Sequence, residues 1–219
     1  MFERNSLFFY LLGVLMSFRQ TPYVKVANVI SKDTCYFIND YLQLKKDTVK
    51  FMFDNHFINL SSKMMGEFKD TAETSSQTYA CAVDLVTETL LKLLLPVVEK
   101  YSEMKLYPTY SYLRIYQKGD SLIKHKDRNS CQVSATLNIG GALWPIYAQL
   151  DSGPKQKIIL EAGDMMVYAG CDVTHWRSPL KEKECVQVFL HYNDQKGILE
   201  DHHKYDRRPR LGLPYTIDI

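Results

Sequence analysis

Residues 108–127, PTYSYLRIYQKGDSLIKHKD, decide how this chain folds. The run from 109 to 116 is rich in aromatic and β-branched side chains, so it predicts a β-strand. Alternate side chains of a strand point to the same face, and Tyr112, Arg114 and Tyr116 would therefore share one side. The turn sequence Lys118-Gly119-Asp120 ends this strand.

Similar runs follow this stretch, separated by Gly, Pro, Asp and Asn. They cover residues 132–139, 157–160, 165–168 and 185–192. Many short strands with turn signals between them are typical of a sandwich or a barrel. The second half of the chain therefore predicts a β-barrel.

The first half of the chain has a different pattern. Residues 23–30 alternate as in a strand, and Ser31 is placed to cap a helix that follows. An apolar stripe over 82–101 predicts a long amphipathic helix, which Pro96 would kink or divide. We expect a polar loop at 71–78. The fold class is therefore α+β, with N-terminal helices that buttress the barrel.

A chain of 219 residues fits one domain. We divide it into an apolar N-terminal segment (1–20), a helical buttress (21–105), the barrel (106–195) and a basic C-terminal tail (196–219). The cluster of basic residues at 202–210 predicts a solvated tail. A formal net charge of +2 gives no support to nucleic acid as a partner.

Two further features of the sequence bear on where in the cell the protein is located. The apolar run at 7–18 is twelve residues long, shorter than the roughly 20 that a spanning helix needs, so it predicts a core-packed helix with no membrane contact. The cysteines are scattered singly, with no CxxC pair: Cys35, Cys81, Cys131, Cys171 and Cys185. This pattern favours reduced thiols in a soluble, cytoplasmic protein over disulfides or a zinc site.

The sequence His125-Lys126-Asp127 places an imidazole and a carboxylate two residues apart, where an extended chain points them the same way. His175 follows 48 positions after Asp127, just beyond the strand at 165–168 and the turn around Gly170. Two histidines and one carboxylate are the facial triad of Fe(II) oxygenases, which leaves positions open for a chelating 2-oxo acid and dioxygen.

The far carboxylate of such a 2-oxo acid needs a cation. Lys183 is at the head of the last predicted strand, eight residues after His175. His191 shares the face of Lys183 on that strand and would donate to the carboxylate nearest the metal. Tyr116 would supply a hydroxyl group.

The pattern Tyr116-x8-His125-x-Asp127, then His175, then Lys183-x7-His191 resembles the prolyl 4-hydroxylase branch of the 2-oxoglutarate/Fe(II)-dependent dioxygenases. The resemblance extends over about residues 22–192, and in detail it is to a group of viral and bacterial members.

This resemblance implies a double-stranded β-helix (jelly-roll) fold and a hydroxylase. The implied reaction converts 2-oxoglutarate and dioxygen to succinate and CO₂ while a C–H bond is hydroxylated. His125, Asp127 and His175 would bind iron, and Lys183, Tyr116 and His191 would bind 2-oxoglutarate. Ascorbate as a reductant and a prolyl residue of a protein or peptide as substrate are further implications.

The chain departs from the family pattern at two places. Relatives usually separate the second histidine from the basic residue by nine or ten positions, whereas Lys183 follows His175 by eight, which a shortened loop would explain. Arg177, two residues after His175, is a competing ligand for the carboxylate. Asn138 stands where many relatives have a tyrosine that contacts 2-oxoglutarate. Arg114 and Arg177 are also candidates for substrate contacts. There are two alternatives to a prolyl hydroxylase. One is an enzyme of the same fold that acts on a nucleic acid or a small molecule, and the other is a non-catalytic binding module.

Overall fold

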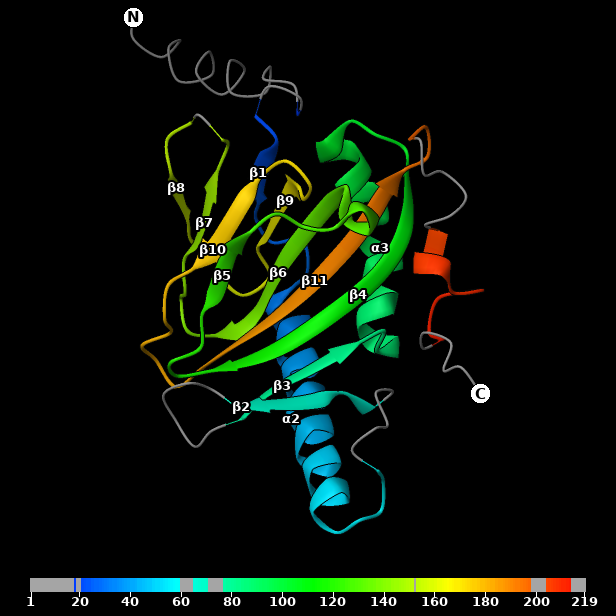
Figure 1. The fold of residues 1–219 in the computed structure, drawn as a ribbon, viewed down its shortest axis with the longest axis vertical. Coiled ribbons are helices and arrows are strands. Elements are labelled where there is room, and N and C mark those ends of the chain that lie inside the picture. Colours follow the sequence, from blue (N-terminus) through cyan, green and yellow to red (C-terminus); the bar gives the residue numbers. More distant parts are fainter. Residues whose placement is uncertain are drawn as a thin grey trace, which may run out of the picture.

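The computed structural model describes residue 18 and residues 21–59, 65–70, 77–151, 153–197 and 204–213. Its strands form two antiparallel sheets (Figure 1). The larger sheet contains, in spatial order, β1 (Tyr23–Val26), β9 (Met165–Ala169), β6 (Val133–Gly141), β11 (Glu184–Asp194), β4 (Leu106–Gln117), β3 (Gln77–Ala82) and β2 (Glu67–Asp70). The smaller sheet contains β5 (Leu122–His125), β10 (Thr174–Arg177), β7 (Ile146–Gln149) and β8 (Gln156–Ile158).

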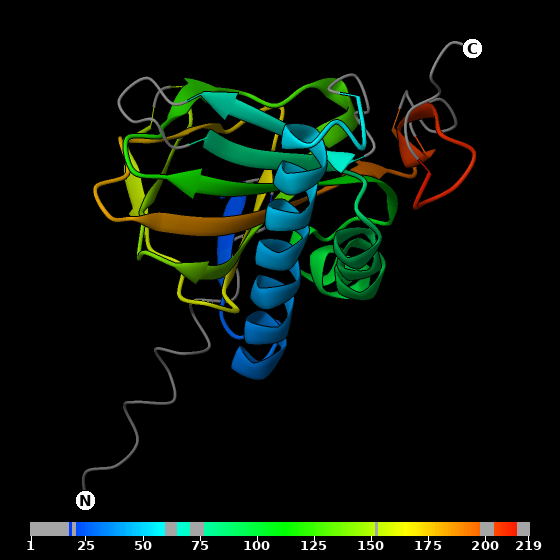
Figure 2. The same ribbon diagram turned by 90° about the horizontal axis from the view of Figure 1, so that it is seen from below.

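Two helices pack on the larger sheet, α2 (Lys32–Asp54) and α3 (Leu85–Ser102) (Figures 1 and 2). Ser31 caps α2 as predicted, since its hydroxyl accepts from the amide of Thr34 at 3.1 Å. Asp84 caps α3 in the same way, accepting from the amide of Val86 at 2.9 Å. Both caps satisfy amide groups that the first helical turn leaves without partners.

Pro96 lies inside α3, so of the two predicted alternatives, a kink or a division, the division does not occur. A proline removes one backbone hydrogen bond and leaves the carbonyl of the residue four positions earlier without its partner. Pro96 and that residue, Lys92, are both exposed, so water can reach this carbonyl.

The central strands β4 and β11 separate the two sides of the larger sheet. On β4, Leu113 and Ile115 belong to the main apolar core beneath the helices. Tyr112, Arg114 and Tyr116 line a cavity on the opposite side, which confirms that they share one face. The strand alternation thus separates packing residues from residues that face the interior of the barrel.

The sequence analysis missed five short strands, β2, β3, β5, β7 and β10. Because β1, β2 and β3 all join the larger sheet, the region 21–105 is not purely helical. Gln77 and Thr78, predicted as loop, begin β3, and residues 71–76 lie outside the described residues. Four of the five strands have only four residues, too few for a clear alternation.

The C-terminal region also differs from the prediction. The short helical turn η3 (Lys204–Arg207) contacts β4, and Arg208 beyond it is 4% exposed. In the described part of the basic cluster, Lys204, Arg207 and Arg210 are exposed, as a solvated tail predicts, whereas Arg208 is buried. Its burial depends on an ion pair with Glu88 of α3, a residue 120 positions away that no local pattern reveals.

Of the predicted N-terminal helix at 7–18, only Phe18 is described, and its side chain is buried. The rest of this prediction lies outside the described residues. Within the part of the chain that is described, no helix combines the length and apolar character needed to span a membrane.

Candidate metal site

Strand pairing brings the two predicted histidines side by side. β5 and β10 are antiparallel neighbours in which His125 and His175 are direct partners, and their ring centroids are 4.3 Å apart. His175 follows β9 and the turn around Gly170, as predicted, and it lies on a further strand, β10. Asp127 lies two residues after β5, where its amide donates to the carbonyl of Gly170 at 2.8 Å. One ligand atom from each of the three residues falls within 4.8 Å of the others.

Each imidazole is oriented by a backbone carbonyl. Nδ1 of His125 lies 2.7 Å from the oxygen of Ile123, and Nδ1 of His175 lies 3.1 Å from the oxygen of Val173. A ring nitrogen that donates to a carbonyl leaves the other nitrogen, Nε2, with a lone pair for a metal. The two Nε2 atoms are 3.4 and 3.6 Å from Oδ1 of Asp127. The three atoms therefore converge on one point.

The second oxygen of Asp127 is held by the protein. Oδ2 accepts from the Ser134 hydroxyl at 2.6 Å, and that hydroxyl lies 2.9 Å from Nδ1 of His191. A Cβ atom at Gly170 would collide with the Cys131 carbonyl and lie 2.7 Å from Asp127 Oδ2, so only glycine fits here. Ser134 and Gly170 were not found from the sequence, because nothing local marks their contact with a residue on another segment.

The charges of the cluster suit metal binding. Burial opposes ionisation of Asp127, but the hydrogen bond from His125 and the nearby imidazoles lower its pKa to about 2. Burial lowers the pKa of His175 and lowers that of His191 to about 4, whereas hydrogen bonding to Asp127 raises the pKa of His125. An ionised carboxylate beside a neutral His175 is the protonation state that a divalent metal requires.

The donor set fits an iron centre. Two imidazole nitrogens and one carboxylate oxygen are the ligands of the facial triad of non-haem Fe(II). Among the described residues, His125, Asp127 and His175 are the one group of three such side chains close enough to share an ion.

The triad opens onto a cavity of about 170 Å³ between the two sheets. Its wall includes the predicted cosubstrate residues Tyr116 and His191 as well as Arg114. The other residues in the wall are the three metal ligands together with Tyr110, Tyr112, Leu122, Tyr168 and Phe189. Tyr168, which was not predicted, places its hydroxyl 3.3 Å from Nε2 of His175.

Arg177 lies on β10 two residues after His175, on the same inward face of the strand, and is only 2% exposed. It donates to the carbonyl of Trp144 and, at 3.0 Å, to Oε1 of Gln187, while its Nε has no hydrogen-bond partner. Among the described residues no carboxylate pairs with it, and burial lowers its pKa. A buried cation without a counter-ion is costly, so this position favours binding of an anion.

Lys183 does not occupy the predicted place. Its side chain is exposed, it precedes the first residue of β11, and it does not line the cavity. The predicted register assumed that strand alternation continues through Lys183, but β11 begins only at Glu184. Asn138 is buried and does not line the cavity; its amide nitrogen donates to the Leu160 carbonyl at 2.7 Å.

No family model and no curated protein matches this chain. Solved structures do match. A prolyl-4-hydroxylase from Pseudomonas putida has 14% identity and a TM-score of 0.59, with 79% of this chain and 92% of that chain covered. An oxidoreductase of the 2OG-Fe(II) oxygenase family from Burkholderia pseudomallei has 13% identity and a TM-score of 0.59, covering 87% and 91%.

HygX from Streptomyces hygroscopicus, solved with nickel and 2-oxoglutarate bound, has 11% identity and a TM-score of 0.56, with 90% of this chain and 89% of that chain covered. At sequence identities of 11–14%, the structural similarity establishes the fold alone. The chain has the α+β double-stranded β-helix fold of the 2OG-Fe(II) oxygenases, which confirms the predicted fold class.

Proposed function

We propose that this protein is an Fe(II)- and 2-oxoglutarate-dependent oxygenase. The observation that carries the proposal is the convergence of His125 Nε2, His175 Nε2 and Asp127 Oδ1 on one side of a cavity. The wall of this cavity includes Tyr116, which interacts electrostatically with the buried Arg177, an arginine that has no carboxylate partner among the described residues. A divalent metal would neutralise the carboxylate, and a dicarboxylate would neutralise the arginine.

His125, Asp127 and His175 are the residues that would hold the iron. The bound iron would supply oxidation of a substrate C–H bond to C–OH, balanced by conversion of 2-oxoglutarate and dioxygen to succinate and CO₂. The protein's own part is to orient the reactants and to keep water away. The Ser134 hydroxyl holds the carboxylate of Asp127 at 2.6 Å, and the Val173 carbonyl holds the imidazole of His175 at 3.1 Å.

We assign the far carboxylate of 2-oxoglutarate to Arg177 and Tyr116 rather than to Lys183. Tyr116 lines the cavity and is 1% exposed, and burial raises the pKa of its phenol, so it remains a hydrogen-bond donor at neutral pH. The planar guanidinium of Arg177 can bind a carboxylate through two parallel hydrogen bonds. Arg114, whose guanidinium lies 4.7 Å from the Tyr116 ring centroid, would add positive charge at the cavity wall.

The proposed reaction is hydroxylation, with a prolyl residue of a protein or peptide as the substrate. This narrower assignment rests on the sequence resemblance described above. Two solved structures of similar fold are described as a carbocyclase and an epimerase, so the fold alone does not select the reaction.

A ligand titration tests the oxygenase assignment. The full-length protein is titrated without oxygen with Fe(II) and then with 2-oxoglutarate, and a charge-transfer absorption band is expected only when both are present. Mn(II) binding followed by electron paramagnetic resonance measures the metal site independently of turnover. On admission of air, with ascorbate present to keep iron reduced, succinate should form. A protein that binds neither Mn(II) nor Fe(II) with 2-oxoglutarate would overturn the proposal.

The substrate assignment is tested separately. Proline-containing peptides are incubated with the loaded protein, and mass spectrometry should detect an increase of one oxygen atom on proline. Succinate formation without any modified peptide, together with oxygen addition to a small molecule or an oligonucleotide, would reject the prolyl substrate and leave the oxygenase assignment intact.

A further inference from the structure

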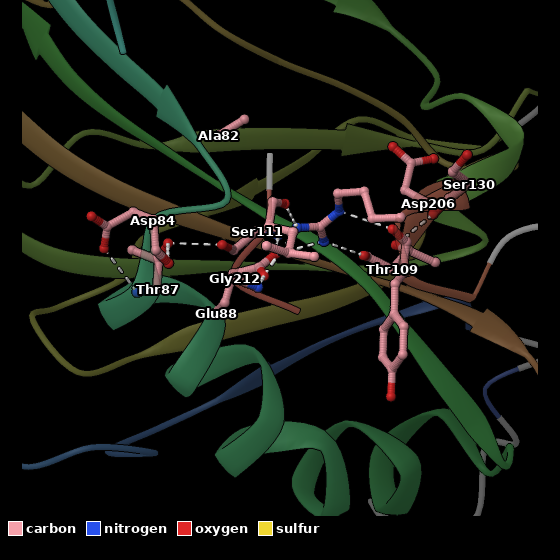
Figure 3. A network of polar contacts seen from close by, with 12 residues as sticks. Ala82, Asp84, Thr87, Glu88, Thr109, Ser111, Ser130, Asp206 and Gly212 are labelled. Atoms are coloured by element: carbon pink, nitrogen blue, oxygen red, sulfur yellow. Dashed lines mark hydrogen bonds and ion pairs between the residues drawn. The ribbon is translucent and has the colours of Figure 1, made fainter. Parts of the chain in front are cut away.

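Residues 204–213, here called the C-terminal strap, cross the barrel surface next to the metal site. The strap begins with η3, which packs against β4, and it continues past Arg208 toward α3. Figure 3 shows the polar network that holds it, with Glu88, Thr109, Gly212 and Asp206 labelled.

The strap is anchored by a buried ion pair. Arg208 donates to both carboxylate oxygens of Glu88, at 2.7 and 3.1 Å, and their side chains are 1% and 3% exposed. Arg208 also donates to the Thr109 carbonyl of β4 at 2.8 Å, and the amide of Gly212 donates to Glu88. An ion pair that is buried and fully hydrogen-bonded resists separation, because either charge alone would be left without water or a partner.

The backbone of the strap is strained. Tyr205, Asp206 and Arg207 have φ values of 53°, 52° and 67°, in the left-handed region that non-glycine residues rarely adopt. Such conformations persist only where surrounding contacts impose them. Here they turn the side chain of Asp206 inward, so that the residue is 5% exposed.

Asp206 binds the residue that follows a metal ligand. Its two oxygens accept from Nη1 and Nη2 of Arg128 at 3.0 and 2.6 Å, a bidentate pair. Arg128 also donates to the Ser130 hydroxyl at 2.9 Å. Arg128 is the neighbour of Asp127 in the chain, so the strap restrains the segment that carries the metal-binding carboxylate.

The same arginine supports the cavity wall. The guanidinium of Arg128 lies 4.7 Å from the ring centroid of Tyr110, a cation–π contact. Tyr110 lines the cavity, and its ring is 4.5 Å from that of His191. A chain of contacts therefore runs from Asp206 through Arg128 and Tyr110 to the interior of the site.

We propose that Asp206 is a positioning residue of the metal and cosubstrate site, acting through Arg128 on Asp127 and Tyr110. This inference rests on the proposed oxygenase function. It assigns the C-terminal strap a role in the site in addition to its packing through the buried Arg208 anchor.

A double-mutant cycle tests the proposal. Asp206→Asn, Arg128→Gln and the double variant are compared with the unaltered protein for Mn(II) affinity, 2-oxoglutarate affinity and succinate formation. We expect each single variant to bind Mn(II) or 2-oxoglutarate about tenfold more weakly, in the range seen when groups that orient metal ligands are removed. The double variant should be no weaker than the single variants, because both changes break the same contact. Asp206→Glu should restore part of the affinity.

Arg210→Gln is the matched control, since it removes a charge from an exposed position of the same strap and should leave both affinities unchanged. Urea unfolding of every variant separates positioning from folding. Equal affinities in the unaltered protein and Asp206→Asn, or losses that add in the double variant, would overturn the inference. Failure of the unaltered protein to bind Mn(II) would instead reject the proposed function.

Discussion

Two carboxylates of this protein, the buried Glu88 and the partly exposed Asp127, have opposite surroundings. Glu88 is bound on both oxygens by Arg208, a permanent cation. Asp127 contacts two imidazoles and the hydroxyl of Ser134, and no arginine or lysine of the described residues pairs with it. Glu88 is thus neutralised within the protein, whereas under the proposed function a bound metal ion would match the charge of Asp127.

Two buried arginines, Arg208 and Arg177, differ from each other in the same way. Arg208 has a carboxylate partner, and Arg177, equally buried, has none among the described residues. One matched pair joins the C-terminal strap to α3. Of the two unmatched charges, Asp127 lines the cavity and Arg177 interacts electrostatically with Tyr116 of the cavity wall. We therefore propose that Glu88 and Arg208 contribute to stability, whereas Asp127 and Arg177 contribute to ligand binding.

The largest effect is expected at the unmatched carboxylate. Asp127→Ala removes a metal ligand directly, so Mn(II) affinity should fall by more than about 100-fold, beyond the range typical for supporting residues, and succinate formation should cease. Asp172→Asn, an exposed carboxylate on the turn before β10, is the control and should bind Mn(II) normally. Retention of Mn(II) affinity by Asp127→Ala would remove Asp127 from the proposed site.

Breaking the matched pair should instead reduce stability. Arg208→Met leaves Glu88 buried and unpaired, and the free energy of unfolding should fall by about 3–5 kcal/mol, measured by urea titration. The double variant Glu88→Gln with Arg208→Met should recover much of this loss, since no isolated charge remains. If Arg208→Met were as stable as the exposed-site variant Arg210→Gln, the pair would not be a structural anchor.

A smaller effect on binding is expected at the unmatched arginine. Arg177→Met should weaken 2-oxoglutarate binding by about 10- to 100-fold, the loss expected for hydrogen bonds to a charged group. Mn(II) affinity measured without 2-oxoglutarate should change little, because Arg177 is not a ligand. Unchanged 2-oxoglutarate affinity in this variant would mean that a cation other than Arg177 binds the far carboxylate of 2-oxoglutarate.

The smallest effect is expected at Lys183. Its side chain is exposed outside the cavity, so Lys183→Ala should change 2-oxoglutarate affinity by less than about twofold, as is usual for exposed charges. Isothermal titration of this variant beside Arg177→Met decides directly between the two basic residues that the sequence left open. A larger loss in Lys183→Ala than in Arg177→Met would reverse the assignment.

The sequence could propose His125 and Asp127 as candidate ligands because their signal is local: they are two positions apart, and an extended chain points such residues the same way. His175 has no such local link to them, because it lies 48 positions after Asp127. The long strands β4, β6 and β11 were also predicted, because their alternation is long enough to stand above chance. Strands of four residues, such as β5 and β10, carry no such signal, although their pairing sets His125 opposite His175.

The amino-acid sequence by itself determined the fold class, the three candidate ligands and the family that their spacing resembles. Only the tertiary structure decided which basic residues are buried and which are solvated: Arg177 and Arg208 are buried, and Lys183 is exposed. The physical reason is that a charge is buried or exposed according to partners distant along the chain. Glu88 lies 120 positions from Arg208, and no periodicity or motif around either residue encodes that contact.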